Sequence, residues 1–294
     1  MNDLGKIIKI ARLDRNMTQK ELGQNICTQA TISNIEKSGS IPSKEILLKI
    51  ANRLNIEFDD VYGFINEDAT ENNKIMKQVK IFCRKFQHKD AGKLLNRFDE
   101  KSISSSNEEK EYYYYKGITS LVGSENFSDA HYYFNIVNSI PVENEISIYE
   151  LLSNNGIGAA YFMKEEDEKA KKYAEKTLIL LEEYLENGYD KKYTSEIIRI
   201  YFNTAKILSK VQKYQEAVKL CSLGLDLLQL NDNFFGMENL LYEKAYNLCM
   251  LNKKTEAEEF YFYAAAIARL NKNKVTTETI SKNMKEYGLM HYKY

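Results

Sequence analysis

The side chains best suited to chemistry in this sequence are two amides in a short segment near the N-terminus, Gln29 and Asn34, which flank Ala30. A glutamine or asparagine amide can donate to and accept from adenine at once, and an alanine methyl group can contact the methyl group of thymine. Residues of these types on one helix could therefore read DNA bases. The alternative, which stays open at this point, is that they only solvate the surface of a helix.

The segment is predicted to form the third of five short helices. The apolar face of the first helix is made by Leu4, Ile7, Ile8 and Ala11. Asn16 ends this helix. Thr18 and Glu21 match a capping box, in which the hydroxyl accepts from a backbone amide of the first turn while the glutamate reaches back to the cap. They open a second helix over residues 18–25.

Three further helices are predicted in the same way, from capping residues and apolar positions. Thr28 caps the third, with Ile32 and Ile35 facing inward, and Ser38-Gly39 stops it. Ser43 caps the fourth. The fifth is indicated by Phe58, Val61 and Tyr62. Short capped helices, with a three-residue turn between the second and the third, are typical of a helix-turn-helix domain.

This segment resembles the XRE class of phage-repressor DNA-binding domains over residues 4–62. The resemblance is carried by MTQKELGQ at 17–24, TISNIEK at 31–37, IPS at 41–43 and LLKIA at 47–51. It implies that the third helix lies in the major groove, with Gln29, Ala30 and Asn34 facing bases and with Gln19 and Lys37 on phosphates. The candidate DNA-binding residues are Gln19, Thr28, Gln29, Ala30, Thr31, Ser33, Asn34 and Lys37.

Composition fits a small basic head on an acidic body. The chain of 294 residues has a net charge of −1, but residues 1–55 carry nine Lys or Arg against five Asp or Glu, a surplus of four. The length suffices for two domains. Only two prolines occur, which favours an all-α chain because proline breaks helix interiors.

Several functional classes have no support in the sequence. The four cysteines form no CxxC pair and only three histidines occur, so we expect reduced thiols and no metal site. No signal peptide is recognisable, and the longest apolar run, residues 260–268, is far below the roughly 20 residues that span a bilayer. A cytoplasmic protein is expected. No nucleotide-binding glycine loop or nucleophile motif occurs, so we expect neither an enzyme nor a cofactor.

Small residues recur at a fixed offset in the rest of the chain. The pairs are Gly117 and Ala130, Gly158 and Ala170, Ala205 and Ala217, and Ala245 and Ala257. The second members advance by 40, 47 and 40 residues. Small residues on two packed helices allow a close approach, which is typical of tetratricopeptide-like hairpins. Four residues after each second member stand, in chain order, Phe134, Ala174, Cys221 and Tyr261, where that pattern has an aromatic residue or a substitute.

The predicted fold is therefore all-α, with a helix-turn-helix domain followed by a right-handed tetratricopeptide-like helical repeat array. The predicted domains are residues 1–65 for the head, a polar linker at 66–75, and the array at 76–294. An additional hairpin is expected over Met76–Phe98 and a capping helix over Thr276–Tyr294. The aromatic runs at 112–115 and 260–263 could stack on nucleic acid, but their place in the repeats favours core and groove positions.

The combination of a helix-turn-helix head and about five such hairpins resembles the RRNPP group of peptide-pheromone receptors, and most closely its PlcR-like branch. The resemblance is carried by QNIC at 24–27, QV at 78–79, CR at 83–84 and YFNTAKIL at 201–208. It implies a regulator in which a short re-imported peptide binds the concave groove and changes how a dimer presents its heads to DNA.

The resemblance also implies peptide-binding residues. Asn155 and Asn203 match positions whose amides hold the peptide backbone, although without the family either could equally solvate a helix surface. Arg84 matches the first member of a basic pair for the peptide carboxylate, but Phe86 replaces the second, which puts that contact in doubt. Glu243 stands where the branch can have a neutral amide, which predicts a more acidic groove and a ligand with a basic residue.

The expected function is thus transcription regulation by a short signalling peptide in quorum sensing. The expected partners are double-stranded DNA with a palindromic operator, the peptide, and a second copy of the chain in a homodimer. No membrane and no cofactor are expected. The alternative is a regulator whose repeat domain binds a protein partner instead of a peptide.

Overall fold

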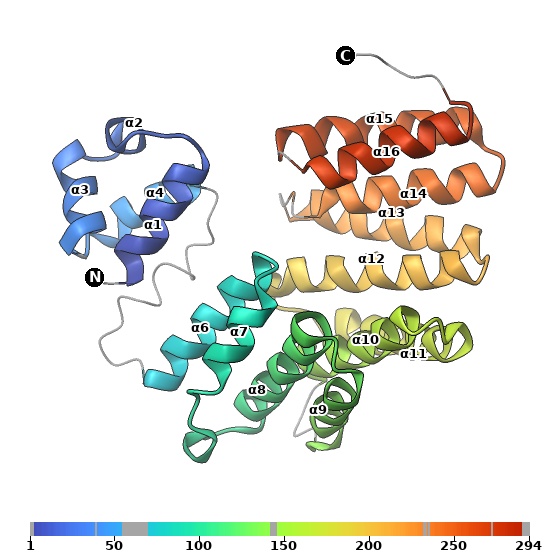
Figure 1. The fold of residues 1–294 in the computed structure, drawn as a ribbon, viewed down its shortest axis with the longest axis horizontal. Helices are drawn as coiled ribbons and strands as arrows, with labels where there is room; N and C mark the ends of the chain where they lie inside the picture. The colour runs from blue at the N-terminus through green and yellow to red at the C-terminus, as the bar shows by residue number, and fades with distance from the viewer. Residues whose placement is uncertain are drawn as a thin grey trace. The chain divides into compact units, whose positions relative to one another are not determined.

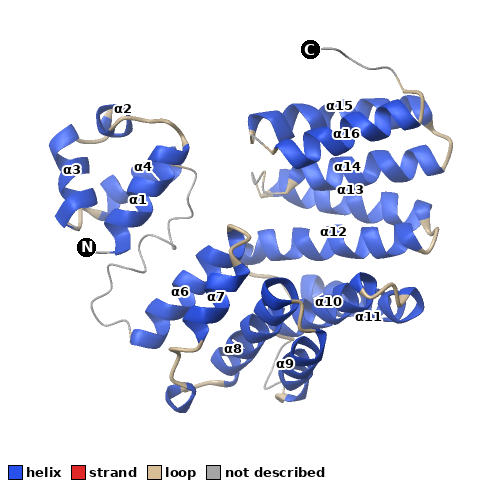
Figure 2. Ribbon diagram, viewed as in Figure 1, coloured by secondary structure: helices blue, strands red, loops and turns tan. Residues whose placement is uncertain are grey.

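The computed structural model describes residues 3–38, 40–54, 70–141, 146–231, 234, 236–271 and 273–289. All regular structure in these ranges is helical, and no strand occurs in them (Figure 2). The chain divides into two compact units, Met1–Ile103 and Ser104–Tyr294. The predicted all-α class is confirmed.

The first four helices of the first unit are those that the sequence predicts. They are α1 (Asp3–Asp14), α2 (Gln19–Gly23), α3 (Gln29–Ser38) and α4 (Lys44–Arg53). Their shared core is fully buried and consists of Leu4, Ile8, Leu22, Ile32, Ile35, Leu47, Ile50 and Leu54. The prediction that the second helix reaches Asn25 is wrong, because Asn25 adopts a left-handed φ of 58°. Phe58, Val61 and Tyr62 lie outside the described residues.

The predicted caps are confirmed. Thr18 Oγ1 accepts from the backbone amide of Glu21 at 3.2 Å, and Glu21 Oε2 accepts from the amide of Thr18 at 2.6 Å. Thr28 Oγ1 accepts from the amide of Thr31 at 3.1 Å, and Ser43 Oγ accepts from the amide of Ile46 at 3.4 Å. These bonds fix where the helices around the turn begin.

A helical hairpin completes the first unit, formed by α6 (Glu71–Arg84) and α7 (His88–Leu95). It confirms the predicted hairpin over residues 76–98, but α6 begins earlier, inside the predicted linker at 66–75. The earlier start has a local cause, since Thr70 Oγ1 caps the helix by accepting from the amide of Asn73 at 3.3 Å. Residues 66–69 lie outside the described residues, and the division between head and array stays a prediction.

The second unit is a stack of helical hairpins (Figure 1). Its helices are α8 (Ser106–Ile118), α9 (Phe127–Ser139), α10 (Ile148–Met163), α11 (Asp167–Glu186), α12 (Thr194–Lys210), α13 (Tyr214–Leu230), α14 (Met237–Met250), α15 (Lys254–Leu270) and α16 (Lys274–Glu286). α8, α10, α12, α14 and α16 lie side by side in one layer, which we call the inner layer. α9, α11, α13 and α15 each pack against their own inner partner. α16 confirms a helix at the predicted capping position, but it begins at Lys274 and ends at Glu286, before the predicted end at Tyr294.

The predicted small residues lie where helices pack most closely. Ala130, Ala170, Ala205, Ala217, Ala245 and Ala257 are fully buried. Two glycines of the second unit make room for the ring of Phe134, because a Cβ added to Gly117 or to Gly156 would lie 2.5 Å from it. The ring therefore fits between α8 and α10 only because both positions are glycine.

The turns inside the hairpins share one backbone conformation. A single residue with positive φ closes each turn: Glu125, Glu165, Gln212 and Asn252. These residues advance by 40, 47 and 40 positions, as the buried alanines do. The same hairpin geometry thus repeats four times in the second unit.

Candidate nucleic-acid interface and ligand groove

The third helix has one buried face and one exposed face. Ile32 and Ile35 are fully buried, whereas Gln29, Ala30 and Asn34 are exposed. The remaining candidate residues are Thr28 and Lys37, which are exposed, and Thr31 and Ser33, which are half-buried. The predicted base-facing residues therefore share the solvent side of α3.

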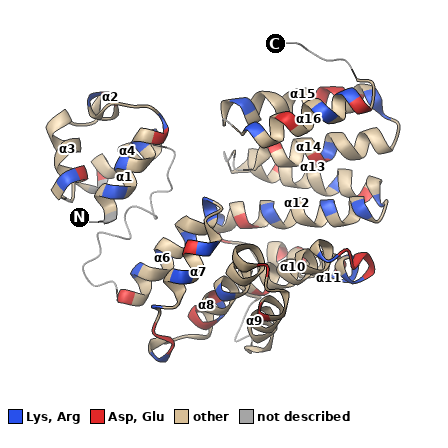
Figure 3. Ribbon diagram, in the orientation of Figure 1, with Lys and Arg blue, Asp and Glu red and all other residues tan. Residues whose placement is uncertain are grey.

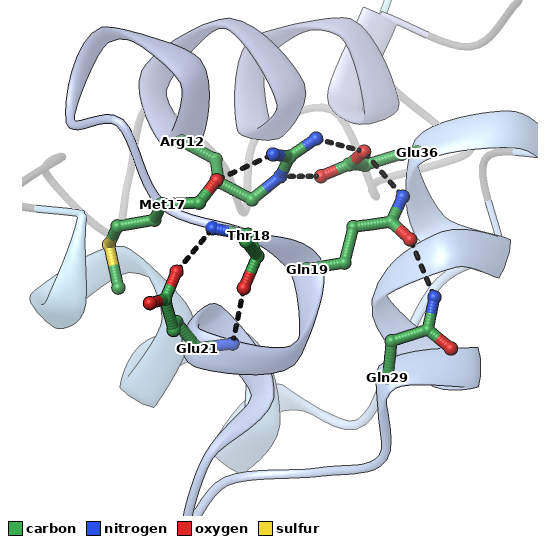
Figure 4. A network of polar contacts seen from close by, with 7 residues as sticks. All are labelled: Arg12, Met17, Thr18, Gln19, Glu21, Gln29 and Glu36. Atoms are coloured by element: carbon green, nitrogen blue, oxygen red, sulfur yellow. Dashed lines mark hydrogen bonds and ion pairs between the residues drawn. The ribbon is translucent and has the colours of Figure 1, made fainter.

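A chain of polar contacts holds the start of this face (Figure 4). Arg12 Nε and Nη2 donate to the two carboxylate oxygens of Glu36 at 2.6 and 2.9 Å. Gln19 Nε2 donates to Glu36 Oε2 at 2.9 Å. Gln29 Nε2 in turn donates to Gln19 Oε1 at 2.7 Å. One buried ion pair thereby orients two amides in succession, from α1 through α2 to α3.

The ion pair at the base of this chain is almost completely buried. Arg12 is 7% exposed and Glu36 is 2% exposed. Burial alone would raise the pKa of Glu36, but the hydrogen bonds from Arg12 and Gln19 outweigh it and hold the pKa below its ordinary value. The hydrogen bond to Glu36 raises the pKa of Arg12. Both groups are therefore charged near neutral pH. Arg12 Nη1 also donates to the carbonyl of Met17 at 2.7 Å, which ties down the loop before α2.

The arrangement leaves Gln29 equipped for base recognition. One N–H of its amide is used by Gln19, so the second N–H and the carbonyl oxygen face solvent. These are the donor and the acceptor that a bidentate contact with adenine needs. Gln19 itself was predicted to contact a phosphate. Here its amide nitrogen and oxygen are both engaged within the protein.

The end of α2 is held from α4. Arg53 Nη1 donates to the backbone carbonyl groups of Leu22 at 3.2 Å and of Glu21 at 3.4 Å, and also to that of Gln24. Carbonyl groups at the end of a helix have no partner within the helix, so a cation there stabilises it. The sequence analysis missed this contact and the Arg12–Glu36 pair, because each joins residues far apart along the chain.

In the second unit, the two predicted asparagines lie together on neighbouring inner helices. Asn203 Nδ2, on α12, donates to Asn155 Oδ1, on α10, at 2.9 Å, and Asn155 Nδ2 donates to Thr204 Oγ1 at 3.5 Å. Asn155 is only 4% exposed, whereas Asn203 is half-exposed. Of the pair, Asn203 is therefore the more accessible residue, and Asn155 holds its amide from the buried side.

A pocket of about 370 Å³ opens between α10, α12, α14 and α16. Glu243 lines it, together with Lys206 and Lys210 of α12. Four aromatic residues also line it: Phe162, Phe202, Tyr242 and Tyr246. The sequence singled out only Glu243. With two lysines beside it the lining is not predominantly acidic, and the structure gives no support to the inference of a basic ligand.

Arg84, which the sequence resemblance suggests as a contact for the peptide carboxylate, is the last residue of α6 in the first unit. Phe86 follows it in a left-handed turn, with φ of 59° and 84% of its surface exposed. The assignment of Arg84 to a peptide carboxylate stays a prediction.

No metal-binding cluster of three or more His, Cys, Asp or Glu occurs among the described residues. The four cysteines are free thiols, and burial raises the pKa of Cys221 far above its ordinary value. Within the same described ranges, no helix is both long and apolar enough to cross a membrane.

Comparison with known proteins agrees with this geometry. The Helix-turn-helix family matches residues 8–61. A helix-turn-helix domain is therefore present in this part of the chain. This match includes α2, α3 and the polar contacts between them. No curated protein sequence matches the chain.

The whole chain is similar in fold to solved regulators. PlcR of Bacillus thuringiensis, in complex with the peptide PapR7 and DNA, is 21% identical, with 95% of this chain and 99% of that chain covered and a TM-score of 0.60. PlcR in its apo form is 18% identical, with 95% of this chain and 98% of that chain covered and a TM-score of 0.61. ComR of S. thermophilus, in complex with DNA and its signalling peptide ComS, is 20% identical, with 97% of this chain and 100% of that chain covered and a TM-score of 0.51. The chain has the fold of PlcR and ComR, and the PlcR-like fold is the one that the sequence resemblance implies.

Proposed function

We propose that this chain is a DNA-binding transcription regulator whose activity is controlled by a short signalling peptide bound in the groove of its helical array. The observation that carries the proposal is that one chain joins a helix-turn-helix domain to the fold of PlcR and ComR over nearly its full length. Both of those regulators were solved with DNA and a signalling peptide. No enzymatic activity is part of the proposal, and the protein would act in the cytoplasm, where its DNA is.

On DNA, α3 would lie in the major groove with its exposed face on the bases. Gln29 and Asn34 would bond to adenines and Ala30 would contact a thymine methyl group. Thr28, Thr31 and Ser33 would lie beside them, and Lys37 would contact a phosphate. Gln19 would act indirectly, because its amide holds Gln29. Its amide could contact a phosphate only if it gave up its hydrogen bond with Glu36 or with Gln29.

Two DNA-binding domains are required to select one binding site in a genome. A single recognition helix contacts only a few base pairs, which is too little sequence information for a unique site. We therefore propose that the regulator binds a palindromic operator as a homodimer. Sedimentation at micromolar concentration should give two chains per operator duplex, and a monomer with and without DNA would contradict the homodimer.

In the array, Asn203 would bond to the backbone of the peptide. An amide can pair with a peptide N–H and C=O whatever the neighbouring side chains are. Its present partner, Asn155, would hold it in place from the buried side. The pocket of about 370 Å³ has the size of sites that take small ligands. That size favours a peptide side chain over the broad surface of a folded protein partner, which is the alternative function.

Control of DNA binding then follows from linkage. A peptide can shift the regulator only if it binds one arrangement of the dimer more tightly than the other. The experiment is to select bound duplexes from a random pool with the full-length protein, and then to repeat the selection with pooled synthetic heptapeptides. A preferred sequence whose recovery depends on peptide supports the proposal. A preferred sequence that no peptide affects supports the protein-partner alternative.

A further inference from the structure

Two lysines of α12 line the pocket of the second unit. Lys206 and Lys210 are four residues apart on α12, so they lie on one face of it, and both are exposed. Neither forms an ion pair with a carboxylate in the described part of the chain. Lys213, just beyond the helix, does so with Glu175 and Glu216. The pocket thus presents two ammonium groups to whatever enters it.

The pocket contains one acidic side chain, which is buried. Glu243 is only 5% exposed, and burial raises its pKa above the ordinary value. Its Oε1 accepts from Asn247 Nδ2 at 3.1 Å, and the charge of Lys206 acts on it as well, so this one carboxyl group faces two ammonium groups. The other titratable groups of the lining, Tyr242 and Tyr246, have pKa values that burial raises further, so they stay neutral. The charge that a ligand meets is therefore positive.

Aromatic rings fix the position of one of these charges. Lys206 Nζ lies 5.4 Å from the ring centroid of Phe162 and 5.5 Å from that of Phe202. An ammonium group over two ring faces is held in place by its attraction to the rings. An ammonium group in this position can form a charge-assisted hydrogen bond with a carboxylate. The same rings offer an apolar wall beside the charge.

The lysines also share a face with the proposed backbone contact. Arg199, Asn203, Lys206 and Lys210 follow one another at the three- and four-residue spacing of a single helical face, and basic residues recur along α12 in Figure 3. Arg199 has Glu196 nearby as a counter-charge. Lys206 and Lys210 share one buried carboxyl group, that of Glu243, in the lining of the pocket. A peptide whose backbone meets Asn203 lies within reach of both lysines.

We propose that the ligand of this pocket is an acidic peptide, which presents a carboxylate to Lys206 and Lys210 and an apolar or aromatic side chain to Phe162 and Phe202. This inference rests on the proposed peptide-controlled function and specifies the charge of the peptide. It is opposite to the basic ligand that Glu243 predicts from the sequence.

The test uses full-length protein and a synthetic library of random heptapeptides. Immobilised protein is incubated with the library, and retained peptides are identified by mass spectrometry. The parent is compared with the double variant Lys206→Gln/Lys210→Gln. The matched control is Lys172→Gln/Lys219→Gln, which removes two exposed lysines of the outer helices α11 and α13 outside the pocket. Lys206→Arg/Lys210→Arg keeps the charge. Circular dichroism checks that every variant is folded.

We expect the parent, the arginine variant and the control to enrich peptides with Asp or Glu by roughly tenfold or more, because hydrogen bonds to charged groups are the strong ones. The Lys206→Gln/Lys210→Gln variant should lose this enrichment. A second library with amidated C-termini separates the two sources of a carboxylate. If the enrichment of Asp or Glu survives amidation, the bound carboxylate belongs to a side chain. If amidation abolishes the retention of peptides, and the double variant does so too, the bound carboxylate is the C-terminus of the peptide.

Two results would overturn the inference. If the parent retains peptides with no acidic excess and amidation changes nothing, the pocket does not select a carboxylate, although the proposed function stands. The same conclusion follows if the double variant enriches acidic peptides as the parent does. If the parent retains no peptide from either library, the peptide-controlled function fails as well.

Discussion

The amide of Gln29, on the exposed face of α3, is held by the amide of Gln19, whose oxygen lies 2.7 Å from Gln29 Nε2. Gln19 is held in turn by Glu36 of the buried ion pair. The residue proposed to read a base is thus positioned by two residues that need not touch the base. Fixing a side chain before binding lowers the entropy that binding must overcome.

The first prediction follows from this contact. Gln19→Ala removes the partner of Gln29, and operator affinity should fall by roughly 2- to 12-fold, the value of one ordinary hydrogen bond. Affinity for random DNA should change less. Fluorescence anisotropy with both duplexes measures this, and Gln24→Ala, at an exposed position after α2, is the matched control. An unchanged ratio of specific to non-specific affinity in Gln19→Ala would show that Gln29 needs no support.

Asn34→Ala tests direct readout. Loss of a bidentate contact with a base costs about 1–3 kcal/mol, so operator affinity should fall by roughly 5- to 150-fold. Non-specific binding should barely change, because phosphate contacts remain. Asn52→Ala, at an exposed position of α4, serves as the control. Equal binding of parent and Asn34→Ala to operator and to random DNA would exclude Asn34 from the interface.

Glu36→Gln leaves the buried guanidinium of Arg12 without its counter-charge. Breaking a buried pair in this way costs about 3–5 kcal/mol. Hydrogen exchange of peptides from α1 and α3 should therefore become faster in the variant near neutral pH. Arg12→Met/Glu36→Leu, which removes both charges, should restore most of the protection. A single variant as protected as the parent would mean that the pair adds no stability.

The same pair predicts how stability depends on pH. Because the pKa of Glu36 is lowered in the folded protein, its contribution is complete above the ordinary glutamate pKa of about 4.3 and is lost as pH falls through the folded value. Urea midpoints of α1–α4 unfolding should thus decrease more steeply with acidification in the parent than in Glu36→Gln. Parallel profiles would contradict this.

Two glycines of the array should respond oppositely to alanine. A Cβ at Gly117 would lie 2.5 Å from the Phe134 ring, so Gly117→Ala should lose about 1–3 kcal/mol through overpacking. A Cβ at Gly158 would meet its nearest neighbour at an ordinary 3.4 Å. Gly158→Ala should be neutral or stabilising by up to about 1 kcal/mol, since glycine weakens a helix. Thermal melting of the full chain compares them, and the same sign for both would refute this packing.

The extent of prediction from sequence differed between local and tertiary features. Caps such as Thr18–Glu21 and small residues such as Ala205 and Ala217 were predictable, because each is a local rule with a fixed spacing. The adjacency of Asn155 and Asn203 was predictable once their helices were placed as neighbours in a repeat. In contrast, the left-handed turns at Glu165 and Gln212 carry no glycine signal, and the repeated register alone imposes them.

Tertiary contacts account for what the sequence missed at the two candidate sites. Arg12 and Glu36 stand 24 residues apart and look like ordinary surface charges until α1 and α3 are packed. Lys206 and Lys210 look like a solvated helix face until α10, α14 and α16 close a pocket around them. Glu243 alone predicts a basic ligand, whereas the lysines that line the pocket beside it lead us to propose an acidic one.

The central claim is that one chain couples operator binding to peptide binding, and its most direct test is a reciprocal titration. Operator affinity is measured with and without a peptide retained by the parent protein, and peptide affinity is measured with and without operator, for the parent and for Asn203→Ala. In the parent, each ligand should change the affinity of the other by the same factor, roughly 5- to 150-fold. Asn203→Ala should bind peptide roughly 5-fold or more weakly while its peptide-free operator affinity stays at the parent value. A peptide that binds the parent without changing its operator affinity, or equal peptide affinity in parent and variant, would contradict the account.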